Sequence, residues 1–125
     1  NHIDLYINIR NTIESFIIED IDMCKILGIL IDNAIEASIE SEQKILNIGI
    51  WDDESELYII ISNSFKQKPI IHKIFKKGYS TKGLNRGLGL SIVRDLIDKK
   101  YFNSSMNTKV KDDLFSVEIT IKKID

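Results

Sequence analysis

The chain has 125 residues, of which 43% are hydrophobic and 29% charged, and its formal net charge is −2. This is the composition of one folded domain with a single core, and we expect that domain to span residues 1–125. The single Cys24 excludes an intramolecular disulfide and favours a reducing compartment. The sequence contains no membrane-spanning apolar run and no signal peptide. Because it begins with Asn1 rather than Met, we expect a fragment of a longer protein.

The first half of the chain predicts two strands around one helix. Residues 3–10 and 44–53 alternate apolar and polar side chains, as half-buried strands do, whereas residues 12–21 fit a short strand or a turn. Asp22 can cap a helix that runs to about Ser38. The apolar residues of this helix fall on one face: Ile26, Leu27, Leu30, Ile31, Ala34 and Ile35.

The second half predicts a central strand, a long loop, a helix and a closing strand. Residues 57–63 are densely β-branched, which is typical of a strand buried on both faces or nearly so. Residues 64–86 form a loop of a length that is usually functional or disordered. Residues 87–100 predict a helix and residues 114–124 a strand, with 103–110 as a possible hairpin partner. The apolar face of this helix comprises Leu88, Ile92, Val93, Leu96 and Ile97.

This order of elements predicts a mixed sheet with helices on one face, an α/β two-layer sandwich. It does not fit a dinucleotide-binding fold, because the glycines follow a long loop rather than the tip of a first strand. "GLNRG" also lacks the spacing of a P-loop.

Positive charge is concentrated in residues 64–90, which contain seven cations and no acidic residue. The rest of the chain has ten cations against nineteen acidic residues. The seven are Lys66, Lys68, Lys73, Lys76, Lys77, Lys82 and Arg86. A basic loop in an acidic domain favours a small anionic ligand over nucleic acid, since a nucleic-acid-binding domain is more often basic throughout. A solvated lysine-rich loop is the alternative.

Two asparagines and a pair of glycines stand out among the apolar elements as candidate ligand-binding residues. Asn33, at the edge of the first helix's buried face, can ligate a hard cation such as Mg²⁺ or bond a neighbouring backbone group. Asn63 ends the central strand and can read a base edge or simply terminate the strand. Gly87 and Gly89 open the last helix, where unpaired N–H groups favour a phosphate; an ordinary glycine-rich helix start is the alternative.

Together, these features resemble the ATP-binding domain of the superfamily that contains gyrase, histidine kinases and MutL, the Bergerat fold. "ILGILIDNAIEAS" is similar to its N box, "LYIIISNS" to the strand of its G1 box, "IFKKGYSTKG" to its F box and ATP lid, and "NRGLGLSIV" to its G2 box. The resemblance covers essentially the whole chain. It looks closest to the peptide-pheromone quorum-sensing sensor kinases, the AgrC-like group.

The resemblance implies a role for each matching position. Asn33 would ligate the Mg²⁺ that bridges the ATP phosphates, Asn63 would contact the adenine amino group, and Tyr79 would anchor the lid. The triphosphate would be held by side chains and amides of the following residues: Ser80, Thr81, Lys82, Arg86, Gly87, Leu88, Gly89, Leu90 and Ser91.

Three positions depart from the family pattern. Ile29 stands where many kinases carry a second Asn and the ATP hydrolases a Glu, and Glu36 stands where many kinases carry a cation. Asn63-Ser64-Phe65 replaces Asp-x-Gly. Hydrolysis usually needs a base near the attacking water, which Ile29 cannot supply. Phosphoryl transfer to a histidine needs mainly positioning and charge neutralisation, so the kinase interpretation is favoured.

The sequence therefore predicts the cytoplasmic, ATP- and Mg²⁺-binding catalytic domain of a two-component sensor histidine kinase. The fragment is expected to be soluble and the whole protein to be a membrane-anchored homodimer. His2 and His72 lie in no recognisable acceptor motif, so the acceptor histidine is expected on a separate dimerisation domain, with a response regulator as a further partner. Two alternatives remain: a non-catalytic, nucleotide-responsive interaction module, and an anti-sigma-type serine kinase of the same fold.

Overall fold

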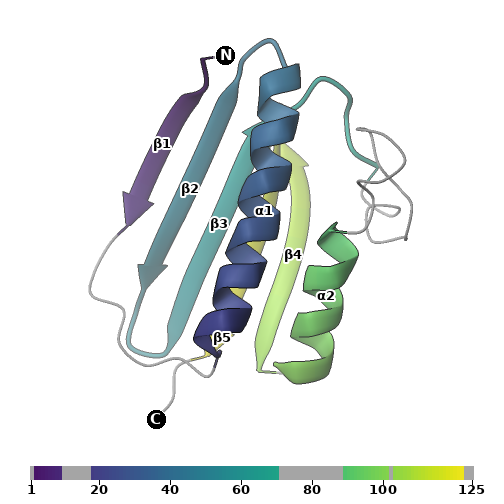
Figure 1. Cartoon of the computed structure of the whole chain (residues 1–125). Coiled ribbons are helices and arrows are strands. Elements are labelled where there is room, and N and C mark those ends of the chain that lie inside the picture. Colours follow the sequence, from purple (N-terminus) through teal and green to yellow (C-terminus); the bar gives the residue numbers. More distant parts are fainter. Residues whose placement is uncertain (1, 10–17, 71–88, 102, 123–125) are drawn as a thin grey trace.

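The computed structural model describes residues 2–9, 18–70, 89–101 and 103–122, which form one sheet with two helices on the same face (Figure 1). The elements are β1 (Asp4–Ile9), α1 (Asp20–Glu40), β2 (Ile45–Asp52), β3 (Glu56–Ser64), α2 (Gly89–Lys100), β4 (Ser104–Lys111) and β5 (Leu114–Lys122). The strand order is β1-β2-β3-β5-β4, with β1 parallel to β2 and the other pairs antiparallel. The predicted α/β two-layer sandwich is confirmed. Within the described ranges, neither helix is long and apolar enough to cross a membrane.

β3 is the central strand, as predicted, but the helices cover only one of its faces. Leu57, Ile59 and Ile61 point toward the helices and are 1–2% exposed. The intervening Tyr58 and Ile60 are only half-buried. The prediction of a strand buried on both faces was therefore wrong, because α1 and α2 lie on the same side of the sheet.

α1 begins earlier than the sequence pattern indicated. Its first residue is Asp20 and its N-cap is Glu19, whose side chain makes no capping hydrogen bond. Asp22 lies inside the first turn, so the prediction that it caps the helix was wrong. The predicted apolar face is confirmed. Its members divide into fully buried Ile26, Leu30 and Ala34 and partly buried Leu27, Ile31 and Ile35.

α2 begins at Gly89 and runs antiparallel to α1 along the same face of the sheet (Figure 1). Val93 and Ile97 are buried as predicted, whereas Ile92 is 39% exposed. Including Ile92 in the buried face was wrong, because the side chains of Ser91 and Val93 on either side of it take the buried positions. Since the two helices run in opposite directions, the start of α2 lies beside the later turns of α1, and its end lies beside the start of α1.

The predicted hairpin between residues 103–110 and the last strand is confirmed by the antiparallel pairing of β4 with β5. Asp112 and Asp113 connect the two strands, and both have positive φ, 53° and 62°. Two consecutive residues with positive φ are typical of the type I′ turn, whose twist matches that of the flanking strands.

The turn between β2 and β3 is organised by the carboxylate of Asp53. It accepts hydrogen bonds from the backbone N–H groups of Ser55 and Glu56, at 2.9 and 2.8 Å, and from the hydroxyl of Tyr58 at 2.9 Å. These bonds, the two backbone ones first, lower the pKa of Asp53 to about 2, and the same carboxylate raises the pKa of Tyr58 to about 12. The ionised form of Asp53 therefore stabilises the folded turn.

We expect Asp53→Asn to make folding stability less dependent on pH in acid. Since the pKa of Asp53 is lower in the folded than in the unfolded chain, its stabilisation is fully present above about pH 4. It is lost as the pH falls through about 2. Urea unfolding at a series of acidic pH values should give a shallower slope for the variant. Tyr58→Phe removes one of the hydrogen bonds to Asp53, so its slope of stability against pH should lie between those of Asp53→Asn and the wild type. Equal slopes for all three proteins would contradict the lowered pKa of Asp53.

Candidate functional site

Asn33 and Gly89 meet where α2 begins beside α1. A methyl group on Gly89 would lie 3.0 Å from Asn33 Nδ2, 3.5 Å from Asn33 Oδ1 and 3.0 Å from Ile29 Cγ2. Carbon contacts of 3.0 Å are shorter than optimal van der Waals separations, so the absence of a side chain at Gly89 lets α2 start this close to α1. Two predicted site residues from distant parts of the sequence are thus brought together.

The amino end of α2 has the properties of an anion site. Gly89 is its first residue, and no acidic residue lies in its first turn. The first N–H groups of a helix have no partner within the helix, and the helix dipole favours negative charge there. Leu90 is partly buried and Ser91 is 7% exposed, so these predicted residues line the start of the helix at the junction with α1.

Asn63 lies on the face of β3 that the helices cover and is 5% exposed. Its Nδ2 donates a hydrogen bond to the backbone carbonyl of Ser64 at 2.9 Å. This bond uses one of the two N–H groups of the carboxamide. The carboxamide oxygen is the part suited to accept a hydrogen bond from a ligand amine.

A buried serine network fixes the end of β3, and sequence reasoning missed it. The hydroxyl of Ser41 donates to the carbonyl of Ser38 at 2.7 Å and lies 2.6 Å from the Ser64 hydroxyl. Ser64 Oγ also accepts from the backbone N–H of Ile45 at 2.8 Å. The three serines are 0–1% exposed. The network joins the end of α1 to β2 and β3, next to Asn63.

A cavity of about 570 Å³ lies at the same end of the fold, lined by Ala37, Glu40, Phe65, Lys66 and Gln67. This volume falls in the usual range for small-molecule sites. Ala37 is one helical turn beyond Asn33 and so shares its side of α1, as helical spacing alone predicts. A second cavity, of about 580 Å³, lies on the open face of the sheet around residues that include Asn47 and Trp51.

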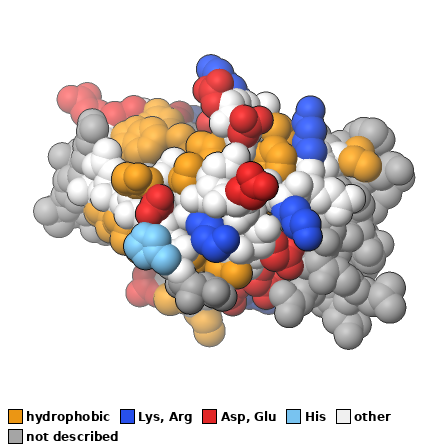
Figure 2. Space-filling view, turned by 90° about the horizontal axis from the view of Figure 1, so that it is seen from above, with side chains coloured by type: hydrophobic (Ala, Val, Ile, Leu, Met, Phe, Trp, Pro, Cys, Tyr) orange, Lys and Arg blue, Asp and Glu red, His pale blue; other side chains and the backbone are white. Residues whose placement is uncertain are grey.

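The remaining predicted site residues lie outside the described part of the chain. They are Tyr79, Ser80, Thr81, Lys82, Arg86, Gly87 and Leu88. Most of the basic run is also outside, with Lys66 and Lys68 as its described members. Figure 2 looks down on the end of the fold that carries the site, where basic and acidic side chains are interspersed. The predicted excess of positive charge therefore stays a prediction.

The few protein oxygens at this site suit a cation that takes most of its ligands from water and from a bound phosphate. Within the described ranges, no three His, Cys, Asp or Glu side chains gather as a metal site. Mg²⁺ usually keeps several waters and binds substrate phosphates with only one or two protein oxygens. The Asn33 carboxamide beside the start of α2 matches that pattern, so the residues present fit a phosphate-bound Mg²⁺.

Comparison with known proteins gives a consistent result. The family model for the GHKL domain matches residues 18–122. Sensor protein CitS of Bacillus subtilis (strain 168) is 39% identical over 74 residues, which are 58% of this chain and 14% of CitS. The chain therefore matches only a small part of that relative's length.

Solved structures share the fold over nearly the whole chain. The catalytic domain of histidine kinase ThkA is 26% identical, with a TM-score of 0.78, and the match covers 97% of this chain and 79% of that one. Histidine kinase ThkA in complex with response regulator protein TrrA matches at 23% identity, with a TM-score of 0.76, over 98% of this chain and 34% of that one. At 23% identity, the likeness to the complex shows the fold alone.

Proposed function

The chain belongs to the GHKL domain family, and from this we propose that it binds ATP with Mg²⁺ as the catalytic domain of a two-component sensor histidine kinase. The observation that carries the proposal is the junction of α1 and α2, where Gly89 lies directly against Asn33. The likeness to ThkA and CitS supports a sensor kinase among the members of the family.

The start of α2 and Asn33 would hold the phosphate end of the nucleotide. The N–H groups of Gly89, Leu90 and Ser91 would donate to phosphate oxygens, and the missing side chain at Gly89 gives the phosphates close access to the backbone. Asn33 Oδ1 would ligate Mg²⁺, which supplies charge neutralisation on the phosphates during transfer. The predicted lid residues Tyr79, Ser80, Thr81, Lys82, Arg86, Gly87 and Leu88 would close over this end.

The nucleobase would lie near Asn63 and the cavity beside Ala37. The bond to the Ser64 carbonyl orients the Asn63 carboxamide, and its oxygen would accept from the amino group of adenine. Asn63 stands here in place of the family's Asp, and like that carboxylate its carboxamide oxygen can accept a hydrogen bond from the adenine amine.

Ile29 supports a kinase over a hydrolase. Its methyl group packs within 3.0 Å of where a side chain on Gly89 would begin, so an apolar group occupies the position from which a base would activate water. Transfer of the γ-phosphate to a histidine needs no such base, because the imidazole is itself the nucleophile.

We further propose that residues 1–125 are a single domain of a longer, membrane-anchored homodimer. The acceptor histidine would lie on its dimerisation domain, and a response regulator would be the next partner, as TrrA is for ThkA in their complex. A peptide-pheromone input, as in the AgrC-like kinases, is the finer assignment that the motifs favour. No nucleic-acid partner is proposed.

Phosphotransfer tests the proposal. The chain is incubated with Mg²⁺, ATP labelled at its γ-phosphate and a purified dimerisation domain that carries the acceptor histidine of a sensor kinase. Acid-labile label on that domain, absent when its histidine is replaced by glutamine, is the expected result. Nucleotide binding without transfer would instead favour the non-catalytic module, which the departures at Ile29 and Glu36 motivate, and label on a serine of a partner would favour a serine kinase.

A further inference from the structure

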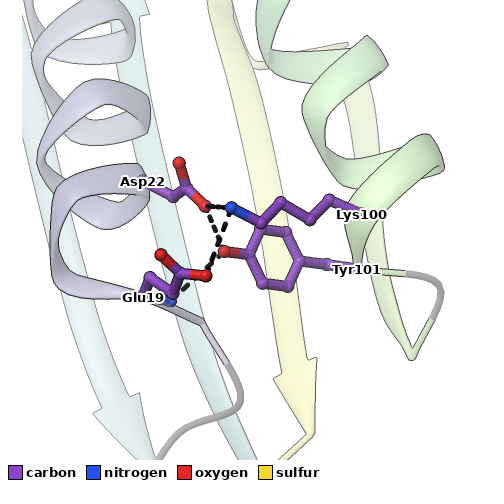
Figure 3. Close-up of polar contacts among 4 residues, drawn as sticks. All are labelled: Glu19, Asp22, Lys100 and Tyr101. Atoms are coloured by element: carbon purple, nitrogen blue, oxygen red, sulfur yellow. Dashed lines mark hydrogen bonds and ion pairs between the residues drawn. The ribbon is translucent and has the colours of Figure 1, made fainter.

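Four residues join the end of α2 to the start of α1, at the opposite end of the helix pair from Asn33 (Figure 3). The Tyr101 hydroxyl accepts a hydrogen bond from the backbone N–H of Glu19 at 3.2 Å and donates one to the Asp22 carboxylate. Lys100 Nζ lies 2.7 Å from Asp22 Oδ2 and 3.3 Å from Glu19 Oε1. Tyr101 is 4% exposed, so this junction is closed to solvent on the tyrosine side.

The Tyr101 hydroxyl completes a pattern that a helix usually makes by itself. In a capping box, the side chain of the third helical residue accepts a hydrogen bond from the backbone N–H of the N-cap residue. Here Glu19 is the N-cap and Asp22 the third helical residue, and the tyrosine hydroxyl lies between them as acceptor from one and donor to the other. The first turn of α1 is thus completed by the residue that follows α2, which ties the two helix ends together.

The charges keep this junction in one protonation state around neutral pH. Hydrogen bonds from Lys100 and Tyr101 lower the pKa of the Asp22 carboxyl, and its carboxylate in turn raises the pKa of Lys100. Burial, followed by the bond to Asp22, raises the pKa of Tyr101, so the hydroxyl keeps the proton that it donates. Asp22, Lys100 and Tyr101 therefore act as a fixed connection rather than a switch at physiological pH.

Because α2 runs from Gly89 to this junction, a tilt of the helix at the junction displaces Gly89 relative to Asn33. α2 has 12 residues, and at 1.5 Å per residue it is about 18 Å long, so a tilt of about 5° at one end moves the other by about 1.5 Å. At that other end, a methyl group on Gly89 would already lie 3.0 Å from both Asn33 and Ile29. A misplacement of about 1 Å in a reacting site can cost about 100-fold in rate.

We propose that Tyr101, with Asp22 and Lys100, is a positioning residue of the nucleotide site. It touches neither nucleotide nor metal, but it sets the tilt of α2 and thereby the place of the Gly89 amide relative to Asn33. This inference rests on the proposed function for its ligand, while the placement of α2 can be measured without one.

The first test compares two identical chemical changes. Tyr101→Phe removes the hydroxyl between the helices, and Tyr58→Phe removes a hydroxyl-to-carboxylate bond at the β2–β3 turn, on the face of the sheet away from the helices. Calorimetric titration of the folded proteins with ATP and Mg²⁺ should show binding about 5- to 20-fold weaker for Tyr101→Phe and unchanged for Tyr58→Phe. Lys100→Met, at a side chain that is 45% exposed, is the second variant if Tyr101→Phe does not fold, and a weakening in the same direction is expected.

The second test needs no nucleotide. In the ligand-free protein, Tyr101→Phe should shift the NMR signals of the Gly89 backbone amide and the Asn33 side-chain amide, whereas Tyr58→Phe should leave both in place. A lower melting temperature with wild-type affinity and unmoved signals would overturn the inference, since it describes a purely structural bond. If the wild type binds no nucleotide, the proposed function fails, and the NMR comparison still decides whether Tyr101 positions α2.

Discussion

Asn33→Ala is expected to weaken the binding of ATP in the presence of Mg²⁺ by about 100-fold, which corresponds to about 2.7 kcal/mol. The reason is that Asn33 is the carboxamide beside the start of α2, and its oxygen is the protein ligand proposed for the cation. Calorimetric titration with and without Mg²⁺ measures the effect. In the presence of a chelator, the wild type and the variant should bind ATP almost equally weakly, because the lost contact is to the metal.

Asn47→Ala is the matched control for this variant. Asn47 pairs with Ser62 on the open face of the sheet, away from both helices, so the same substitution there should leave the affinity unchanged. A wild-type affinity of Asn33→Ala with Mg²⁺ present would contradict the metal assignment. An equal loss with and without Mg²⁺ would assign Asn33 to the nucleotide rather than to the cation.

Gly89→Ala is expected to weaken nucleotide binding by about tenfold without a matching loss of folding stability. The added methyl group would lie 3.0 Å from Asn33 Nδ2, so the carboxamide has to move by a few tenths of an ångström, and the same methyl group covers the amide that would meet a phosphate. Alanine is itself the better helix former. Titration calorimetry and urea unfolding of the same sample separate the two effects.

Gly28→Ala on α1 provides the control. Apart from the neighbouring residues and backbone of its own helix, no atom lies within 4 Å of where its methyl group would begin, and the position is exposed. It should raise the free energy of unfolding by about 0.5–1 kcal/mol and leave nucleotide affinity as it is. If Gly89→Ala bound ATP as tightly as Gly28→Ala, the close contact between α2 and Asn33 would have no part in binding.

Features that depend on local periodicity could be predicted from the sequence. The buried face of α1 through Ile26, Leu30 and Ala34 follows from helical spacing alone, and the dense β-branched run placed Asn63 at the end of the central strand. That Gly89 and Asn33 belong to one site was implied by the resemblance of their motifs to a known family, and neither residue indicates it by itself.

Features that depend on contacts between distant elements could not be predicted. Glu19, rather than Asp22, is the N-cap of α1, and its backbone N–H donates to the hydroxyl of Tyr101, far along the chain. The bond between the hydroxyls of Ser41 and Ser64 likewise joins residues whose neighbours carry no periodic signal. Single serine and tyrosine hydroxyls fit many environments, so their partners become apparent only in the folded chain.

ATP binding at the junction of α1, α2 and the end of β3 is tested most directly by mapping the backbone amide NMR signals of this chain as it is titrated with ATP and Mg²⁺. Among the described residues, we expect the largest shifts at this junction, namely at Asn33, Asn63, Gly89, Leu90 and Ser91. No saturable shift at these residues, or a set of shifts centred instead on Asn47 and Trp51 at the open face of the sheet, would contradict binding at this junction.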